Sequence, residues 1–265
     1  MKYRTLIREL KCLLPGQIEM KVSMVTGANR GIGLELVKRL ASLSSPGQNN
    51  VVIACSRSMS KELEDLMQLP CVHHVTMDIT SQESVDGAHE KISALLGDQG
   101  INLLVNNAAI LIPSKFPTST STEDFSRNFD VNVVGTHRVT VKFSEFLFKA
   151  ADQNSDVDIG CNRAFCLNVS SSVGSIETTT ACWHSAYRVS KAALNMLTRT
   201  TAIEFLQKNV LCCAVHPGWV QTDMGGPNAL ISSSACVDDL MEVIENANRE
   251  HSGVMLRNKM QVMPF

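Results

Sequence analysis

Several features are missing or scarce in this 265-residue chain, and each one narrows the class of protein it can be. It has no apolar run near the roughly 18 residues that a membrane-spanning helix requires. A formal net charge of -2 gives none of the basic excess that draws proteins to nucleic acid. With 44% hydrophobic and 19% charged residues, the chain can still bury one large core. We therefore expect a globular protein with no membrane partner and no nucleic-acid partner.

The nine cysteines form no Cys-x-x-Cys pair and lack the spacing of structural metal ligands. Scattered cysteines of this kind are typical of reduced thiols in a cytoplasmic enzyme, several of them packed as small core residues. The adjacent His73 and His74 are expected to alternate across the end of a strand instead of binding metal. The sequence therefore predicts a cytoplasmic location and no metal site.

Residues 1–20 precede the first apolar strand-like segment and mix basic residues with leucines. An organelle-targeting helix is disfavoured by Glu9, Glu19 and the lack of serine. An appended surface helix, or an upstream translation start ahead of Met20, fits this composition better. We interpret residues 1–20 as an extension of a domain that spans residues 21–265.

Short apolar segments alternate with stretches of helical periodicity along that domain. Strands are expected at 23–26, 51–55, 72–77, 101–105, 164–169, 211–215 and 253–256. Helices are expected at 34–41, 63–67, 81–96, 123–151, 186–207 and 237–247, with Ser81 as an N-cap and Gly97 near a helix end. No repeat or linker divides the chain. This alternation predicts a single α/β domain: a Rossmann-type, doubly wound parallel sheet of about seven strands with helices on both faces.

A glycine-rich loop joins the first predicted strand to the first helix, where backbone N–H groups can receive a pyrophosphate. Its spacing, Gly-x-x-x-Gly-x-Gly, differs from the common G-x-G-x-x-G and is less specific on its own. A tight turn that needs a positive φ angle explains one glycine but not three at such a junction. The residues predicted to bind a dinucleotide here are Gly27, Asn29, Arg30, Gly31, Ile32 and Gly33.

Tyr187 is followed four residues later by Lys191, in a segment expected to be helical, so both side chains share one face. A free phenol has a pKa of about 10, and a nearby cation favours its ionised form. We therefore expect Lys191 to bring the pKa of Tyr187 toward the range of a general acid or base. Alone, the pattern also occurs by chance, and a solvated lysine beside an interfacial tyrosine is the alternative.

Further motifs occur in order along the chain: Thr26-Gly27-x-x-x-Gly31-x-Gly33, Asn106-Asn107-Ala108-Ala109, Asn132, Ser171 and Tyr187-x-x-x-Lys191. With these motifs the sequence resembles the classical short-chain dehydrogenases/reductases from about residue 21 to the C-terminus. Its GANRGIGLELVK opening and its HPGWVQTDMGG segment look like the branch that contains the sniffer-type carbonyl reductases and the bacterial C-factor proteins.

The resemblance implies a catalytic set of Asn132, Ser171, Tyr187 and Lys191. Tyr187 would give its proton to a carbonyl oxygen as hydride arrives from a nicotinamide, and Ser171 would hydrogen-bond the same oxygen. Lys191 would lower the pKa of the phenol and hold the ribose hydroxyls. Asn132 would hold a water in a proton relay to Lys191, although a solvent-facing helical asparagine is the alternative. The serines on either side of Ser171 remain alternatives for its role.

The second predicted strand ends Ala54-Cys55-Ser56-Arg57-Ser58, without the acidic residue that binds the ribose of NAD. Arg57 and Arg30 both suit a 2′-phosphate, so we expect NADPH/NADP+ as the cofactor and not NADH. A simple surface role for Arg57 is the alternative. The resemblance implies further cofactor contacts at Asp78, Ile79, Asn106, Ala108, Pro217, Gly218, Val220 and Thr222, besides Tyr187 and Lys191.

Together these residues predict an NADPH-dependent reductase of a small-molecule carbonyl compound: a ketone, aldehyde or quinone. Apolar walls at 110–116, 176–184, Trp219 and 224–231 would favour an apolar substrate. The resemblance implies a homodimer formed by the helices at 123–151 and 186–207. A dinucleotide-binding signalling or sensing protein and an NAD-linked alcohol dehydrogenase are the alternative functions.

Overall fold

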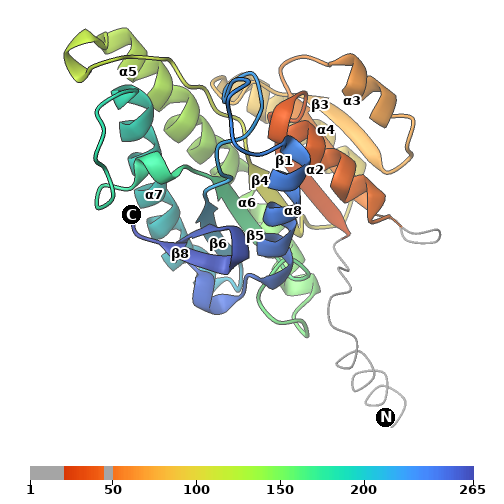
Figure 1. Ribbon diagram of the computed structural model, residues 1–265. Coiled ribbons are helices and arrows are strands. Elements are labelled where there is room, and N and C mark those ends of the chain that lie inside the picture. Colours follow the sequence, from red (N-terminus) through yellow and green to blue (C-terminus); the bar gives the residue numbers. More distant parts are fainter. Residues whose placement is uncertain (1–20, 45–49) are drawn as a thin grey trace, which may run out of the picture.

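A computed structural model describes residues 21–44 and 50–265. The predicted extension at residues 1–20 lies outside the described residues. One sheet of eight strands organises the described chain, in the order β3-β2-β1-β4-β5-β6-β7-β8 (Figure 1). The strands are β1 Val22–Thr26, β2 Val51–Ser56, β3 Val72–Thr76, β4 Leu103–Asn106, β5 Phe165–Val169, β6 Leu211–Val215, β7 Met255–Arg257 and β8 Gln261–Met263.

Neighbouring strands from β3 to β7 pair in parallel, which confirms the doubly wound α/β prediction. The helices are α2 Gly31–Ser42, α3 Lys61–Leu66, α4 Gln82–Leu96, α5 Thr122–Phe129, α6 Thr136–Gln153, α7 Ser185–Gln207 and α8 Ser233–Asn246. Both faces of the sheet are covered, so its strands are buried on two sides. Side chains that alternate along β1 show this: Val25 packs in the core under α2 and α8, and Met24 in the core under α4 and α6.

The predicted limits of α4 are confirmed in detail. The Ser81 hydroxyl accepts a hydrogen bond from the Ser84 N–H at 3.1 Å, which caps the first turn. Gly97 ends the helix with a φ of 56°, a conformation that glycine adopts without strain. Local chemistry was therefore sufficient to place both ends of this helix.

The single helix expected at 123–151 is instead three segments. A π-helical turn, η2 at Asp130–Gly135, separates α5 from α6. The turn brings Gly135 so close to Ile79 that a Cβ atom on the glycine would lie 2.9 Å from Ile79 Cγ1. It also carries the fully buried Asn132, and π-turns of this kind occur frequently at functional sites.

The sheet has eight strands where about seven were expected, because one more strand follows β7. After β7 the chain turns through Lys259 and Met260, both at positive φ angles, and returns as β8, antiparallel to β7. Arg257 Nε donates to Gln261 Oε1 across this hairpin at 2.7 Å. The turn has no glycine, so no local residue pattern predicted it.

All eight cysteines within residues 21–44 and 50–265 are free thiols. His73 and His74 lie in β3, and His74 Nε2 is 3.0 Å from Ser56 Oγ. Over the same described residues, no three metal-ligating side chains gather in one place. None of the helices described is long and apolar enough to pass through a bilayer.

Candidate active site

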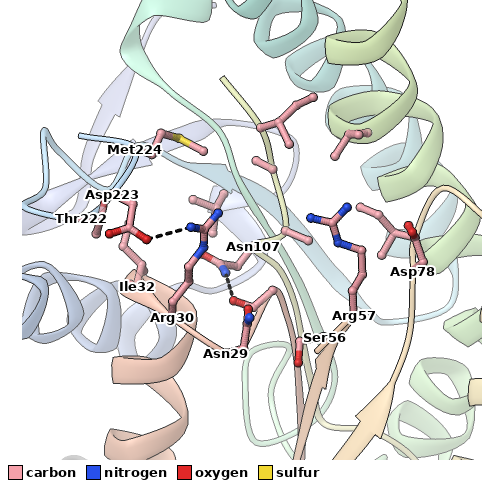
Figure 2. A pocket seen from close by; sticks show the side chains of 18 of the residues that line it. Asn29, Arg30, Ile32, Ser56, Arg57, Asp78, Asn107, Thr222, Asp223 and Met224 are labelled. Carbon is pink, nitrogen blue, oxygen red and sulfur yellow. Dashed lines mark hydrogen bonds and ion pairs between the residues drawn. The ribbon is translucent and has the colours of Figure 1, made fainter. Parts of the chain in front are cut away.

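A cleft of about 490 Å³ opens over the carboxyl ends of the central strands, where β1 and β4 are neighbours (Figure 2). Such a point in a doubly wound sheet, where the chain order reverses, is the usual place for a ligand. Most of the residues predicted to bind a cofactor line this cleft: Gly27, Asn29, Arg30, Gly31, Ile32, Arg57, Asp78, Ile79, Ala108, Tyr187, Lys191, Pro217 and Thr222. The fold therefore brings together residues from six separate segments of the sequence.

The glycine loop forms the floor of one end of the cleft. Gly27 and Gly31 have φ angles of +66° and +56°, which side chains rarely allow. A Cβ on Gly33 would lie 2.3 Å from Gly27 O and 2.5 Å from Asn107 Nδ2, so no larger residue fits there. Asn107 Nδ2 donates to the carbonyls of Thr26 and Gly27 and fixes the loop. Because α2 begins at Gly31, its first N–H groups are available to a pyrophosphate.

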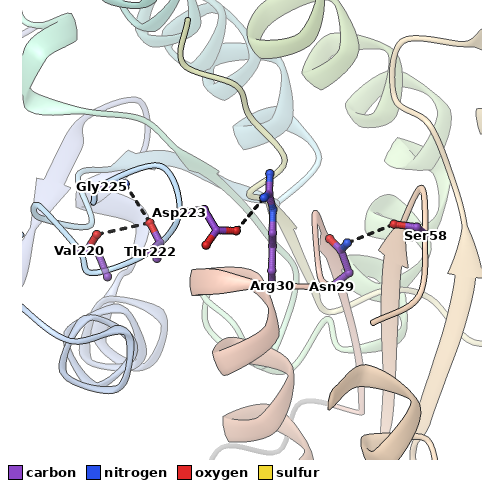
Figure 3. A network of polar contacts seen from close by, with 7 residues as sticks. All are labelled: Asn29, Arg30, Ser58, Val220, Thr222, Asp223 and Gly225. Carbon is purple, nitrogen blue, oxygen red and sulfur yellow. Dashed lines mark hydrogen bonds and ion pairs between the residues drawn. The ribbon is translucent and has the colours of Figure 1, made fainter. Parts of the chain in front are cut away.

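Two guanidinium groups extend into the same end of the cleft, Arg30 from the glycine loop and Arg57 from the end of β2 (Figure 2). Arg30 Nη1 pairs at 2.7 Å with Oδ2 of Asp223, a residue of the loop after β6 (Figure 3). Beside it, Asn29 Nδ2 donates to Ser58 Oγ at 3.4 Å. The ion pair therefore crosses the cleft between its two rims.

Asp78 is a second acidic residue of the cleft and lies beside Arg57 (Figure 2). Burial acts to raise the pKa of its carboxyl, but hydrogen bonds from Thr80 and the charges of Arg57 and Arg138 outweigh it, so the pKa is lowered. Thr80 donates both its N–H, at 2.9 Å, and its hydroxyl, at 2.8 Å, to Asp78 Oδ1. The carboxylate is therefore ionised and held in one orientation.

Tyr187 and Lys191 lie one turn apart on α7, as predicted, with Lys191 Nζ 5.6 Å from the centre of the phenol ring. Lys191 is only 2% exposed, and its ammonium donates to Val169 O at 2.8 Å. Burial lowers the pKa of Lys191 to about 7. Burial likewise raises the pKa of Tyr187 to about 12, against a smaller lowering by its hydrogen bond with Ser171. The expected lowering of the Tyr187 pKa by Lys191 is thus wrong, because the loss of hydration dominates both groups.

The serines that follow β5 have different hydrogen-bond partners. The Ser171 side chain hydrogen-bonds Tyr187 and also accepts from the Val173 N–H at 3.4 Å. Ser170 lines the cleft and Ser171 does not, but the Ser170 hydroxyl donates to Asn195 Oδ1. This geometry favours Ser171 over Ser170 as the partner of the phenol.

Asn132 does not line the cleft, because its side chain binds the segment that follows β4. Its Oδ1 accepts from the Ile110 N–H, and its Nδ2 donates to Ile110 O, each at 2.9 Å. Nδ2 also donates to Ser190 Oγ, which is one residue before Lys191. Asn132 therefore joins the loop after β4 to α7, and its predicted water relay stays a prediction.

Several other predicted residues act one layer behind the cleft wall. Asn106 is buried and donates to Asn168 Oδ1 at 2.8 Å and Thr140 Oγ1 at 3.0 Å, so its side chain joins β4 to β5 and α6. Gly218, at a φ of +86°, and Val220 shape the loop after β6, where Val220 bridges to Ile231. Gly33 supports the glycine loop from behind, as described above.

The prediction missed Asn107 and Asp223, which do line the cleft, whereas Ile110 and Met224 belong to the predicted substrate walls and line it as well. Asn107 could have been predicted from the sequence, since it is the second asparagine of the Asn-Asn-Ala-Ala motif. Asp223 had no such signal, because only the fold places it opposite Arg30.

Comparisons with known proteins agree with this site. A family model described as short chain dehydrogenase matches residues 21–229. The carbonyl reductase Sniffer of D. melanogaster is 30% identical with a TM-score of 0.88, over 93% of this chain and 100% of that chain. An NADPH-bound carbonyl reductase from chicken fatty liver is 32% identical with a TM-score of 0.85, over 93% of this chain and 99% of that one. The C-signal protein of Myxococcus xanthus is 33% identical over 153 residues, which are 58% of this chain and 86% of that protein.

The predicted resemblance to the sniffer-type and C-factor branch is confirmed by these similarities. The matched segment contains the glycine loop, Ser171, Tyr187 and Lys191. This chain therefore belongs to the short-chain dehydrogenase/reductase family of oxidoreductases.

Proposed function

We propose that this protein is an NADPH-dependent reductase that transfers a hydride to the carbonyl carbon of a ketone, aldehyde or quinone. One observation carries the proposal: a phenol and a buried lysine line the same cleft as the glycine loop and two arginines, and a serine hydroxyl hydrogen-bonds the phenol. The similar carbonyl reductases from D. melanogaster and chicken, the latter NADPH-bound, support the same reading.

The residues at the glycine end fit a dinucleotide phosphate. Gly27, Gly31 and Gly33 leave room that a Cβ would fill, and the start of α2 would hold the pyrophosphate. Arg30 and Arg57 would bind the 2′-phosphate through charge-assisted hydrogen bonds. When bound, the nicotinamide supplies the hydride.

Tyr187 is the general acid in this proposal. With a pKa of about 12 the phenol is protonated at pH 7, which is the form that can donate. Its O–H bond breaks as the substrate oxygen gains the proton, and Ser171 hydrogen-bonds the same oxygen. Burial lowers the pKa of Lys191 to about 7, and in its charged form the ammonium stabilises the phenolate that is formed. Asn132 completes the proposed relay that returns a proton to this pair.

The test is cofactor oxidation over a panel of apolar carbonyl compounds, with Tyr187→Phe beside the parent protein. Loss of a proton donor should lower kcat by about 10²- to 10⁴-fold. Turnover by Tyr187→Phe equal to that of the parent would exclude the mechanism. Arg57→Asp should weaken NADPH far more than NADH, and equal weakening of both would show that Arg57 does not bind the phosphate.

A sensing or signalling role is the second candidate, because of the similarity to the C-signal protein of Myxococcus xanthus. It predicts tight dinucleotide binding without turnover of any carbonyl compound. An NAD-linked alcohol dehydrogenase remains the third, and a measured preference for NADH would support it.

We further propose that the protein is a cytoplasmic homodimer. Val189, Met196 and Ile203 repeat every seven residues along α7 and are 48%, 64% and 61% exposed. Val134 and Val141, also seven apart, present a similar exposed row at the start of α6 and just before it. A row of large apolar side chains on each of these helices suits burial against a second copy.

A further inference from the structure

We propose that His184 is a positioning residue, which in its neutral form holds the loop after β4 against the helix that carries Tyr187. The effect on catalysis rests on the proposed function, whereas the contact itself does not. His184 is the N-cap of α7, three residues before Tyr187.

Two reciprocal hydrogen bonds join His184 to Ser114. The His184 N–H donates to Ser114 O at 2.8 Å, and the Ser114 N–H donates to His184 Nδ1 at 3.1 Å. Each residue is thus donor and acceptor to the other, across 70 residues of sequence. The contact joins two segments that were predicted to wall the substrate pocket, 110–116 and 176–184.

The backbone of His184 supports a special role for this contact. Its φ of 57° and ψ of 42° lie in the left-handed region, which is strained for a residue with a Cβ. Such conformations persist where neighbouring contacts hold them, and they gather at functional sites. Here the left-handed turn lets the same residue start α7 and bond Ser114 with both backbone and ring.

Two neighbouring contacts show that the whole loop is fastened to α7. Ile110, which lines the cleft, is tied through Asn132 to Ser190. Thr120 Oγ1 lies 3.0 Å from Ser185 Oγ. Ser114 lies between Ile110 and Thr120 in the sequence. Loss of its bond to His184 would therefore detach the middle of the loop from α7, while Ile110 and Thr120 stay attached.

The contact depends on the protonation state of the ring. Nδ1 can accept from an N–H group only when it carries no proton, so the ring must be neutral with its proton on Nε2. If Nδ1 were protonated, it would face the Ser114 N–H as a second donor, and the hydrogen bond from Ser114 would be lost. Burial, and then the charge of Arg188, lower the pKa of His184, so the contact is intact at neutral pH and is lost in acid.

Among the described residues, Arg188 is the charged group that acts on the pKa of His184, and it lowers that pKa. Arg188 lies one turn along α7, stacked on Trp183 at 4.3 Å, and Trp183 packs edge-on against the His184 ring. Cys182 precedes them in the same loop, and Lys115 follows Ser114 on the facing loop. Removing the charge of Arg188 should therefore raise the pKa of His184.

The experiment compares His184→Asn with His184→Leu in the full-length protein. Asparagine tolerates the left-handed conformation and places an oxygen near the position of Nδ1, but it does not titrate. Leucine removes the acceptor. We expect His184→Leu to raise KM for the carbonyl substrate roughly tenfold, as the loss of one hydrogen bond implies, with little change in NADPH affinity. His184→Asn should keep the KM of the parent at pH 7.5.

The pH profile separates positioning from simple stability. In the parent, KM should rise only once the pH falls below the ordinary titration range of a histidine, about 6.5, because the pKa of His184 is lowered. That rise should be absent in His184→Asn and should move to higher pH in Arg188→Gln. A rise that persists unchanged in His184→Asn would overturn the proposal, and unchanged thermal unfolding of this variant shows that it is folded.

Hydrogen–deuterium exchange of peptides that cover 110–120 tests the contact without any turnover. The Ser114 amide should exchange faster in His184→Leu than in the parent or in His184→Asn at the same pH. Equal protection in all three proteins would refute the contact. If exchange behaves as expected while the parent reduces no carbonyl compound, the contact stands and the proposed function fails.

Discussion

Replacing Lys191 with methionine should stabilise the protein at neutral pH while it removes the proposed activity. Lys191 is 2% exposed and its ammonium has one hydrogen bond, to Val169 O. Methionine is also long and unbranched, so it fills nearly the same volume without burying a charge. The parent protein keeps a cation in its interior, and the variant does not.

The size of the effect follows from the pKa of the buried amine. A fall from 10.5 to about 7 corresponds to about 5 kcal/mol of unfavourable free energy for the charged form, at about 1.36 kcal/mol per pKa unit. Losing the bond to Val169 O offsets about 1–3 kcal/mol of this gain, because the carbonyl is left without that donor. A net gain of about 2–4 kcal/mol should raise Tm by roughly 5–10 °C in a domain of this size.

The difference between the two proteins should depend on pH with a definite sign. The folded pKa lies below the unfolded one, so the unfolded chain binds more protons between pH 7 and pH 10.5, and the parent gains stability as pH rises through that window. Thermal and urea unfolding should be measured at several pH values. The Tm and the urea midpoint of Lys191→Met should exceed those of the parent most strongly at pH 7 and below. Tyr187→Phe is the control, since it removes no buried cation. A Lys191→Met protein that melts below the parent at pH 7 would refute the reasoning.

Three further predictions concern the cleft and the exposed rows. Gly33→Ala places a methyl group where a Cβ would lie 2.3 Å from Gly27 O, so NADPH should bind at least about tenfold more weakly in a fluorescence titration; unchanged affinity would show that the glycine loop is not the phosphate site. Asp223→Asn frees Arg30 from its 2.7 Å ion pair and removes a negative charge from the cleft, so NADPH should bind a few-fold more tightly and NADH about as before; weaker NADPH binding would mean that the ion pair helps to hold the cofactor. Met196→Glu puts a charge in the exposed row on α7 and should give a monomer by light scattering, whereas a dimer that persists would place the interface elsewhere.

The parallel sheet and the catalytic helix could be predicted from sequence because their signals are local. Short apolar segments, the Ser81 cap and the Gly97 stop need no knowledge of distant residues. The pair Tyr187 and Lys191 follows from helix geometry alone, and their separation on α7 was correct.

The features that were predicted wrongly, or not at all, depend on contacts between distant segments of the chain. β8 forms only because β7 offers an open edge, and its turn uses positive φ angles at Lys259 and Met260. The pKa of Tyr187 was misjudged because helical spacing shows a neighbouring charge but not the depth of burial. Asp223 and His184 gained their partners from chain segments 193 and 70 residues away.

The π-helical turn at Asp130–Gly135 has a consequence for how this chain can vary. A π-turn holds one residue more than an α-helical turn, so it amounts to a single inserted residue. Deleting one residue there would let the hydrogen-bond ladder run unbroken from Thr122 to Gln153, while Asn132 rotated by about 100° away from Ile110. The shortened chain would have a more regular helix and a detached loop, so at this place the requirements of folding and of the site are opposed.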